Sequence, residues 1–145
     1  MHIAFVARKT LYSQPGGDTV QVEQSAAALR RQGHNVSITT SGTPLPDNID
    51  VLHGFNLGRP ADLLSYFTSF PGKKVLSSIY VDYALADSIR FPFLYKVLGK
   101  HGLEHMKTLA RAVNGSDRWP GLAYALRGQR RSVQALLKHT HTVLT

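Results

Sequence analysis

The sequence predicts a three-layer α/β domain in which helices flank a mostly parallel sheet. Short apolar runs alternate with amphipathic helical patterns, and this β-α-β order is typical of parallel sheets with right-handed crossovers. The first run, residues 2–7 (HIAFVA), is apolar throughout, as in a strand buried on both faces. The chain has 145 residues, 43% hydrophobic and 18% charged. These values exclude a disordered chain and fit one domain over residues 1–145.

The first β-α-β unit spans the opening forty residues. After strand 2–7, a glycine-rich loop leads to Asp18, whose carboxylate suits the N-cap of a helix predicted over residues 18–32. Gln21 lies three residues later, in the spacing of a capping box. Gly33 suits the C-terminal end of this helix. Val and Ile then alternate with polar residues in the second predicted strand, residues 35–40.

The later elements are apolar or amphipathic runs bounded by Pro, Gly or polar residues. The strands are expected at 49–53, 73–80 and 140–145, and the helices at 61–70, at 91–113 with interruptions at Gly99 and Gly102, and from 119 to about 139. Because the chain stops inside a β pattern, we expect a fragment of a longer protein.

The charge is concentrated in the second half of the chain. The 17 Lys and Arg residues against 9 Asp and Glu residues give a net charge of +8, and all of this excess lies after residue 72. The absence of Cys excludes disulfide scaffolds and thiolate zinc sites and fits a reducing, cytoplasmic compartment. No signal peptide is evident, and no apolar run approaches the roughly 20 residues of a membrane span.

The basic residues of the second half recur at helical spacing. Such amphipathic helices are typical of proteins that bind an anionic membrane surface or another anionic partner. The alternative is a solvated face on two helices that pack in the core. Nucleic acid is not expected as a partner, because aromatic residues do not interleave with these basic residues. The candidate anion- or acceptor-binding residues here are Lys96, Lys100, Arg127, Arg130 and Arg131.

A strand, a Pro-Gly-Gly turn and a helix follow one another at the N-terminus. Gly16 and Gly17 precede the predicted helix, where backbone N–H groups and the helix dipole favour a phosphate. The turn matches neither GxGxxG nor a P-loop, so an ordinary β-α connection is the alternative. Asp18, beside the glycines, would repel an anion unless its carboxylate is turned inward.

Polar side chains follow the predicted strands at their carboxyl ends, where open α/β sheets bind ligands. We expect His53, Tyr80 and Asp82 there as candidate catalytic groups, with Arg8 and Asn56 as candidate binding groups. His53 could equally be a structural strand-end histidine. The seven His residues show no metal-ligand spacing with a carboxylate, so no metal and no bound cofactor are expected.

Several stretches in order resemble a known family. They are HIAFVAR, the Pro-Gly-Gly turn, AAALRRQGHNV, VSITT, IDVLHGFN and VLSSIY. Together they resemble the N-terminal domain of the group-1 (family 4) retaining glycosyltransferases of GT-B architecture. The resemblance covers residues 1–80 well and the remainder loosely. Its most specific part is Ala-Leu-x-x-x-Gly-His-x-Val, which ends at Val36.

The resemblance implies a Rossmann-like acceptor-side domain whose donor-binding partner domain is absent from this chain. It implies that Gly16 and Gly17 lie beside the diphosphate of a nucleotide-sugar and that His53 lies near a glycan or lipid acceptor. Many members carry a His after the fourth strand, where this sequence has Ile-Tyr-Val-Asp; Tyr80 or Asp82 could substitute for it or could only bind the acceptor. The chain alone is expected to be inactive. The alternative is a stand-alone Rossmann-like binding module with a basic face.

Overall fold

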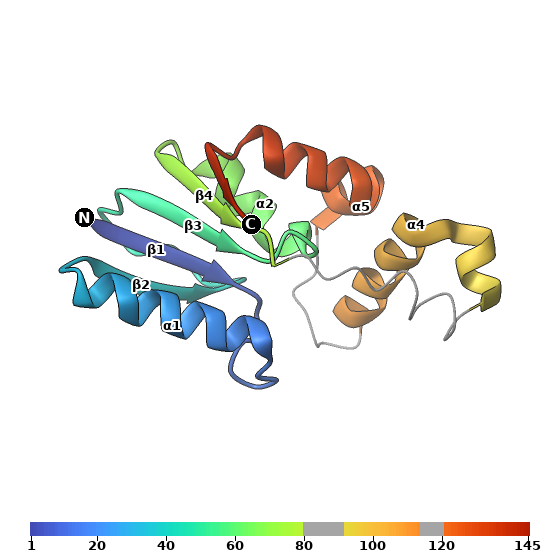
Figure 1. The fold of residues 1–145 in the computed structure, drawn as a ribbon. Coiled ribbons are helices and arrows are strands. Elements are labelled where there is room, and N and C mark those ends of the chain that lie inside the picture. Colours follow the sequence, from blue (N-terminus) through green and yellow to red (C-terminus); the bar gives the residue numbers. More distant parts are fainter. Residues whose placement is uncertain (80–91, 114–120) are drawn as a thin grey trace.

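The computed structural model describes residues 1–79, 92–113 and 121–145 and confirms the predicted α/β fold (Figure 1). A five-stranded, all-parallel sheet has the order β2-β1-β3-β4-β5. The strands are β1 (His2–Ala7), β2 (Asn35–Thr40), β3 (Val51–Phe55), β4 (Lys73–Ser77) and β5 (Thr142–Leu144). The chain thus moves to one side of β1 and then crosses to the other, which makes the domain Rossmann-like.

Helices cover both faces of the sheet, because successive strand residues point to opposite sides. On one face, Phe5 of β1 packs with Val22 of α1 (Gly17–Arg31). On the other face, Val6 packs in one cluster with Phe67 of α2 (Pro60–Ser69) and Leu136 of α5 (Gly121–Lys138). The remaining helix, α4 (Pro92–Val113), packs against α5 at the side of the domain (Figure 1).

Helix α1 begins at Gly17, one residue earlier than predicted, and its N-cap is Gly16. The expectation that Asp18 caps the helix in a box with Gln21 was therefore wrong. Instead, the Thr19 hydroxyl accepts a hydrogen bond from the Gly16 N–H at 3.0 Å. The other end is as predicted: Gly33 has φ +84° just after the helix, a conformation that glycine adopts without a Cβ penalty.

Strand β3 runs two residues further than predicted, to Phe55 instead of His53. The prediction ended at His53 because Gly54 is unusual inside a strand. In the fold, a Cβ at Gly54 would lie 2.8 Å from Cε2 of Phe67, so glycine is what lets α2 pack closely on β3. His53 consequently lies inside the strand and not at its end, which corrects its predicted place on the rim.

Both long helices are divided by a glycine with a positive φ. Helix α4 is interrupted at Gly99 (φ +64°), as predicted, and α5 is interrupted at Gly128 (φ +73°), which was not predicted. Gly102 does not interrupt α4. A Cβ there would lie 2.9 Å from the Cβ of Leu98, so Gly102 instead permits the two segments of α4 to approach each other. The predicted helix start at residue 91 lies outside the described residues.

Candidate active site at the carboxyl edge of the sheet

The β1–α1 and β3–α2 turns lie at the carboxyl edge of the sheet, where ligands bind in folds of this kind. The side chain that organises the first turn is Arg8. Its guanidinium donates to both carboxylate oxygens of Asp18, at 2.6 and 3.0 Å, and to the Gln14 carbonyl at 2.6 Å. It also donates to the carbonyl and hydroxyl oxygens of Thr10, at 2.8 and 2.7 Å. All five N–H bonds of Arg8 thus have acceptors in the chain, and its predicted role toward an external anion stays a prediction.

The Asp18 carboxylate is turned toward Arg8. The hydrogen bonds from Arg8 lower the pKa of Asp18 below its ordinary value, and the charge of Arg59 on the next turn adds to this effect. Asp18 is therefore ionised at neutral pH and offset by the guanidinium, with only about a tenth of each side chain exposed. The repulsion that the sequence suggested for an incoming anion is correspondingly small.

The N-terminus of α1 presents two backbone donors to which the described part of the chain offers no acceptor. Within the described residues, the N–H groups of Gly17 and Asp18 have no hydrogen-bond acceptor. A Cβ at Gly17 would meet no atom within 4 Å, whereas one at Gly16 would lie 3.3 Å from the Asp18 carboxylate. Two N–H groups at the positive end of a helix dipole, beside a residue that has no side chain, favour a phosphate or similar anion.

Strands β3 and β4 end in backbone conformations that non-glycine residues seldom adopt. Asn56 has φ +77° and Ile79 has φ +33°. The Asn56 N–H donates to the Ser77 carbonyl at 3.0 Å, and its side-chain carbonyl accepts from the Gly58 N–H, also at 3.0 Å. Strain of this kind gathers at functional sites, and for β-branched Ile79 it is unusual. Asn56 thus lies at the edge where the sequence placed it.

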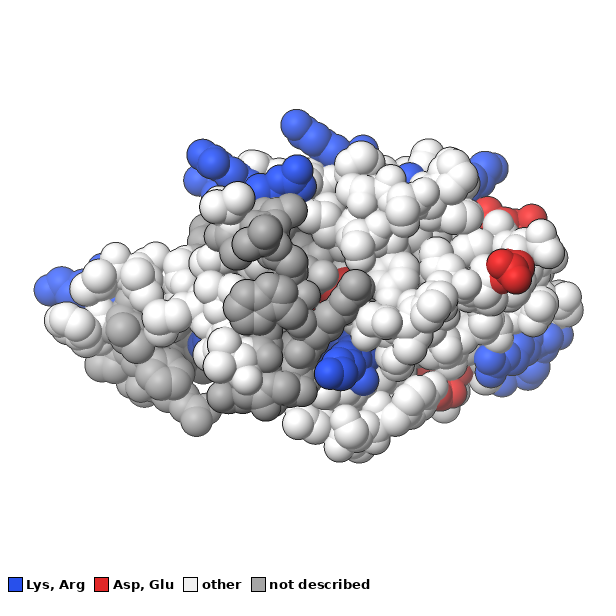
Figure 2. All heavy atoms as spheres, turned by 180° about the vertical axis from the view of Figure 1, so that it is seen from behind, with Lys and Arg blue, Asp and Glu red and all other residues white. Residues whose placement is uncertain are grey.

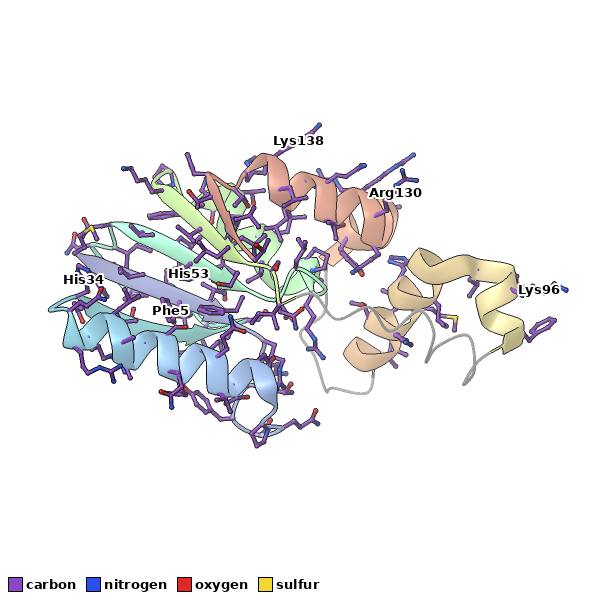
Figure 3. All side chains as sticks on the ribbon, viewed as in Figure 1. Phe5, His34, His53, Lys96, Arg130 and Lys138 are labelled. Carbon is purple, nitrogen blue, oxygen red and sulfur yellow. The ribbon has the colours of Figure 1, made fainter. Side chains whose placement is uncertain are left out.

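His53 lies among aromatic side chains on the α1 face of the sheet (Figure 3). It is 8% exposed, stacks on Phe55 with ring centroids 4.4 Å apart and meets the Phe5 ring edge-on at 4.9 Å. One ring nitrogen, Nε2, forms a hydrogen bond of 2.9 Å with the Ser77 hydroxyl. Burial lowers the pKa of His53 to about 4. This placement matches the structural alternative, so the catalytic role of His53 stays a prediction that its surroundings do not favour.

The remaining predicted site residues lie either outside the described residues or on α4 and α5. Tyr80 and Asp82 lie outside the described residues. Lys96 on α4 and Arg127, Arg130 and Arg131 on α5 are exposed, and α5 covers the sheet face opposite α1. Figure 3 shows Lys96 and Arg130 at the border of the molecule, away from α1. These bases therefore form a surface separate from the glycine turn. Lys100 lies in α4, and its side chain is outside the described part.

Two residues that the sequence did not single out, Arg59 and Gln129, make contacts at the carboxyl edge of the sheet. Arg59 precedes α2, and its guanidinium lies 3.8 Å from a carboxylate oxygen of Asp62. Its positive charge also helps to lower the pKa of Asp18. A base directly before a proline at a helix start could have been a signal for it. Gln129 is buried, accepts from the Tyr124 hydroxyl at 2.6 Å and donates to the Gly58 carbonyl at 2.8 Å. No local signal distinguishes Gln129 from the solvent-facing polar residues of an amphipathic helix.

Among residues 1–79, 92–113 and 121–145, no three His, Asp or Glu side chains gather as metal ligands, and no helix is long and apolar enough to cross a bilayer. Comparison of the chain with models of protein families, with curated proteins and with solved structures found no match. The fold and the site's geometry are accordingly the observations on which a functional proposal can rest.

Proposed function

We propose that this chain is the acceptor-side domain of a glycosyltransferase that moves a sugar from a nucleotide-sugar donor to a glycan, lipid or other acceptor. The observation that carries the proposal is the β1–α1 turn, where the N–H groups of Gly17 and Asp18 have no acceptor among the described residues and a Cβ at Gly17 would meet no atom within 4 Å. Further support comes from the Rossmann-like sheet and from the sequence resemblance stated above. The absence of cysteine supports a cytoplasmic setting.

In this proposal the turn acts on the leaving group. As the sugar–phosphate bond breaks, negative charge grows on the nucleoside diphosphate, and the two N–H groups stabilise that charge more than they stabilise the ground state. Gly17 leaves room for the phosphate to approach the backbone, and the Arg8–Asp18 pair holds the turn in shape. The nucleotide itself would be held by a separate donor-binding domain. Tyr80 and Asp82, which follow β4 in the sequence, remain the candidates for contact with the acceptor hydroxyl.

The substitution Gly17→Val tests this role without disturbing the fold. A Cβ at this position would meet no atom within 4 Å, so the fold tolerates it, but the added side chain would hinder a phosphate that approaches the backbone of the turn. In the natural enzyme that contains this domain, we expect kcat/KM with a nucleotide-sugar to fall about 100-fold. Gln21→Val, one helical turn further along the same face, is the matched control and should keep full turnover.

Either of two results would contradict the proposal. One is a folded Gly17→Val enzyme that transfers sugar at the normal rate. The other is an NMR titration of the natural enzyme, whose donor-binding domain would hold the nucleotide, in which UDP, GDP and ADP leave the amide signals of Gly17 and Asp18 unshifted. Sugar transfer should be sought with a panel of nucleotide-sugars, because the chain does not show which base or sugar is used.

A second candidate is a non-catalytic binding module for an anionic partner. The exposed bases of α5 favour it, because they lie apart from the glycine turn. The panel of nucleotide-sugars distinguishes the two functions. If the natural protein transfers no sugar but still binds an anionic partner, the binding module is favoured.

A further inference from the structure

Helix α5 presents a basic face to solvent. The side chains of Tyr124, Gln129 and Leu136 point inward and are buried. The opposite face carries exposed bases, and residues 121–145 contain no Asp or Glu. Within the described part of the chain none of these bases forms a salt bridge. The exposed bases are Arg127, Arg130, Arg131 and Lys138.

Large apolar side chains are exposed on the same two helices. Seven of the twelve large hydrophobic side chains exposed in the described residues belong to α4 and α5, which singles out this region. Leu126 is 84% exposed and directly precedes the first base of α5, Arg127. The seven are Phe93, Val97, Leu98, Met106, Val113, Leu126 and Leu137.

The first segment of α4, Pro92–Leu98, extends this surface away from the sheet. Gly99 separates it from the rest of the helix. Phe93 and Val97 lie one turn apart and are 76% and 65% exposed, and Lys96 between them is also exposed. The segment thus carries an aromatic ring, an aliphatic side chain and a base, a combination typical of helices at membrane interfaces.

The labelled bases of α4 and α5 lie along one side of the domain. In Figure 3, Lys138, Arg130 and Lys96 follow the upper right border of the molecule, from the end of α5 to the tip of α4. In Figure 2, which shows the domain from behind, blue side chains lie along the corresponding upper left border. The red side chains of the described residues on that face lie away from this border.

We propose that the α4–α5 surface docks onto an anionic lipid bilayer. The bases contact the lipid headgroups, while Phe93, Val97 and Leu126 enter the boundary between headgroups and acyl chains. The exposed apolar side chains favour a lipid surface over nucleic acid, whose contacts with this face would be made by the bases alone. The proposal stands independently of sugar transfer, since it uses none of the groups at the carboxyl edge.

Vesicle co-sedimentation of the unaltered chain tests the proposal first. Binding should be strong to phosphatidylcholine vesicles that contain phosphatidylglycerol and weak to pure phosphatidylcholine. Salt should weaken the binding, because charges are screened over about 8 Å at physiological ionic strength. Equal binding to both kinds of vesicle would overturn the proposal, as would binding that salt does not change.

Paired variants then test the surface itself. Arg130→Gln with Arg131→Gln should lower the partition coefficient about 30-fold, because each base near an anionic surface contributes about a factor of five. Lys9→Gln with Arg31→Gln removes two exposed charges elsewhere on the domain and should leave binding nearly unchanged. An equal loss in both pairs would show that only net charge matters and would overturn the assignment to this face.

Phe93→Ser tests the apolar contribution. We expect about a tenfold loss of vesicle binding, together with an unchanged circular dichroism spectrum, because the ring is exposed in the fold. Unchanged vesicle binding by this variant would overturn the insertion of Phe93. Binding to mixed-sequence duplex DNA or to an acidic protein, without binding to anionic vesicles, would overturn the choice of a bilayer as partner.

Discussion

Phe67 on α2 and Phe93 on α4 are the same side chain in opposite surroundings. Phe67 is completely buried against Gly54 of β3, and Phe93 is 76% exposed at the tip of α4. The contrast extends to the two regions that contain them. Strands β1–β4 with α1 and α2 bury most of their large apolar side chains in two clusters, one on each face of the sheet, whereas α4 and α5 leave many exposed.

Charged groups show the same contrast. Arg8 is paired with Asp18, and Arg59 lies near Asp62, so the strand region neutralises charge locally. The bases of α5 have no such partner within the described residues. The difference suggests a division of labour. The sheet supports a site built from backbone groups, and the helical region offers charge and apolar area to something outside the chain.

The largest expected effect is a loss of stability that tests the contrast between the two phenylalanines. Phe67→Ala should lower the free energy of unfolding by about 3–5 kcal/mol, because it removes a fully buried ring and leaves a cavity. Phe93→Ala should change it by less than about 0.5 kcal/mol. Urea unfolding of both variants measures the difference. Equal losses would mean that Phe93 is buried in solution and that the two regions are alike.

The second prediction concerns the buried imidazole of the strand region. The pKa of His53 is about 4 in the fold, against 6.5 for a free histidine, so the folded state keeps it neutral. Above pH 6.5 both states are neutral and His53 adds no pH dependence. As the pH falls from 6.5 to 4, the unfolded chain binds a proton that the fold does not, and stability should drop by about 3 kcal/mol.

Urea unfolding across this pH range checks the His53 prediction. His53→Phe should flatten the pH dependence, because the titrating group is gone. His139→Gln, at the exposed end of α5, should leave the dependence unchanged and serves as the control. A His53→Phe protein with the full pH dependence would assign the acid sensitivity to another group.

The third prediction tests local neutralisation. Asp18→Asn should destabilise the fold by about 2 kcal/mol, because Arg8 loses its charged partner while remaining largely buried. Asp47→Asn, at an exposed loop position, should have almost no effect. Because the pKa of Asp18 is lowered in the fold, its contribution is present above about pH 3.8 and is lost at lower pH. Thermal unfolding at neutral pH and at pH 3 would show whether this contribution exists.

The sequence predicted the strand and helix order well, because apolar runs and glycine or proline boundaries are local signals. It placed β1, β2 and α2 within about one residue of their observed bounds. It misplaced the end of β3 because a glycine such as Gly54 is typical of a strand end. In the fold, glycine is required at this position because the ring of Phe67, thirteen residues away in the sequence, packs against it. That single error moved His53 from the strand interior to the predicted rim.

The candidate site was predictable to a lesser extent. The glycine turn follows from the Pro-Gly-Gly pattern, and the structure adds that Gly17 faces open space. The sequence did not predict that Arg8 uses all its N–H groups within the chain, because its five hydrogen bonds depend on how residues 10–18 fold back on the end of β1. Gln129 was missed for a similar reason, since its acceptor on Gly58 is 71 residues away.

The glycines that divide α4 and α5 have backbone angles that favour a residue of the opposite chirality. Gly99 and Gly128 have φ near +64° and +73° with ψ near 180°, and a Cβ at either position would meet no atom within 4 Å. These backbone angles mirror the extended conformation that ordinary residues prefer. An L-alanine at either joint would be strained by its chirality alone although its Cβ has room, whereas these angles are ones that a D-alanine adopts without strain. The two joints are therefore positions where a mirror-image residue suits the fold better than any natural side chain.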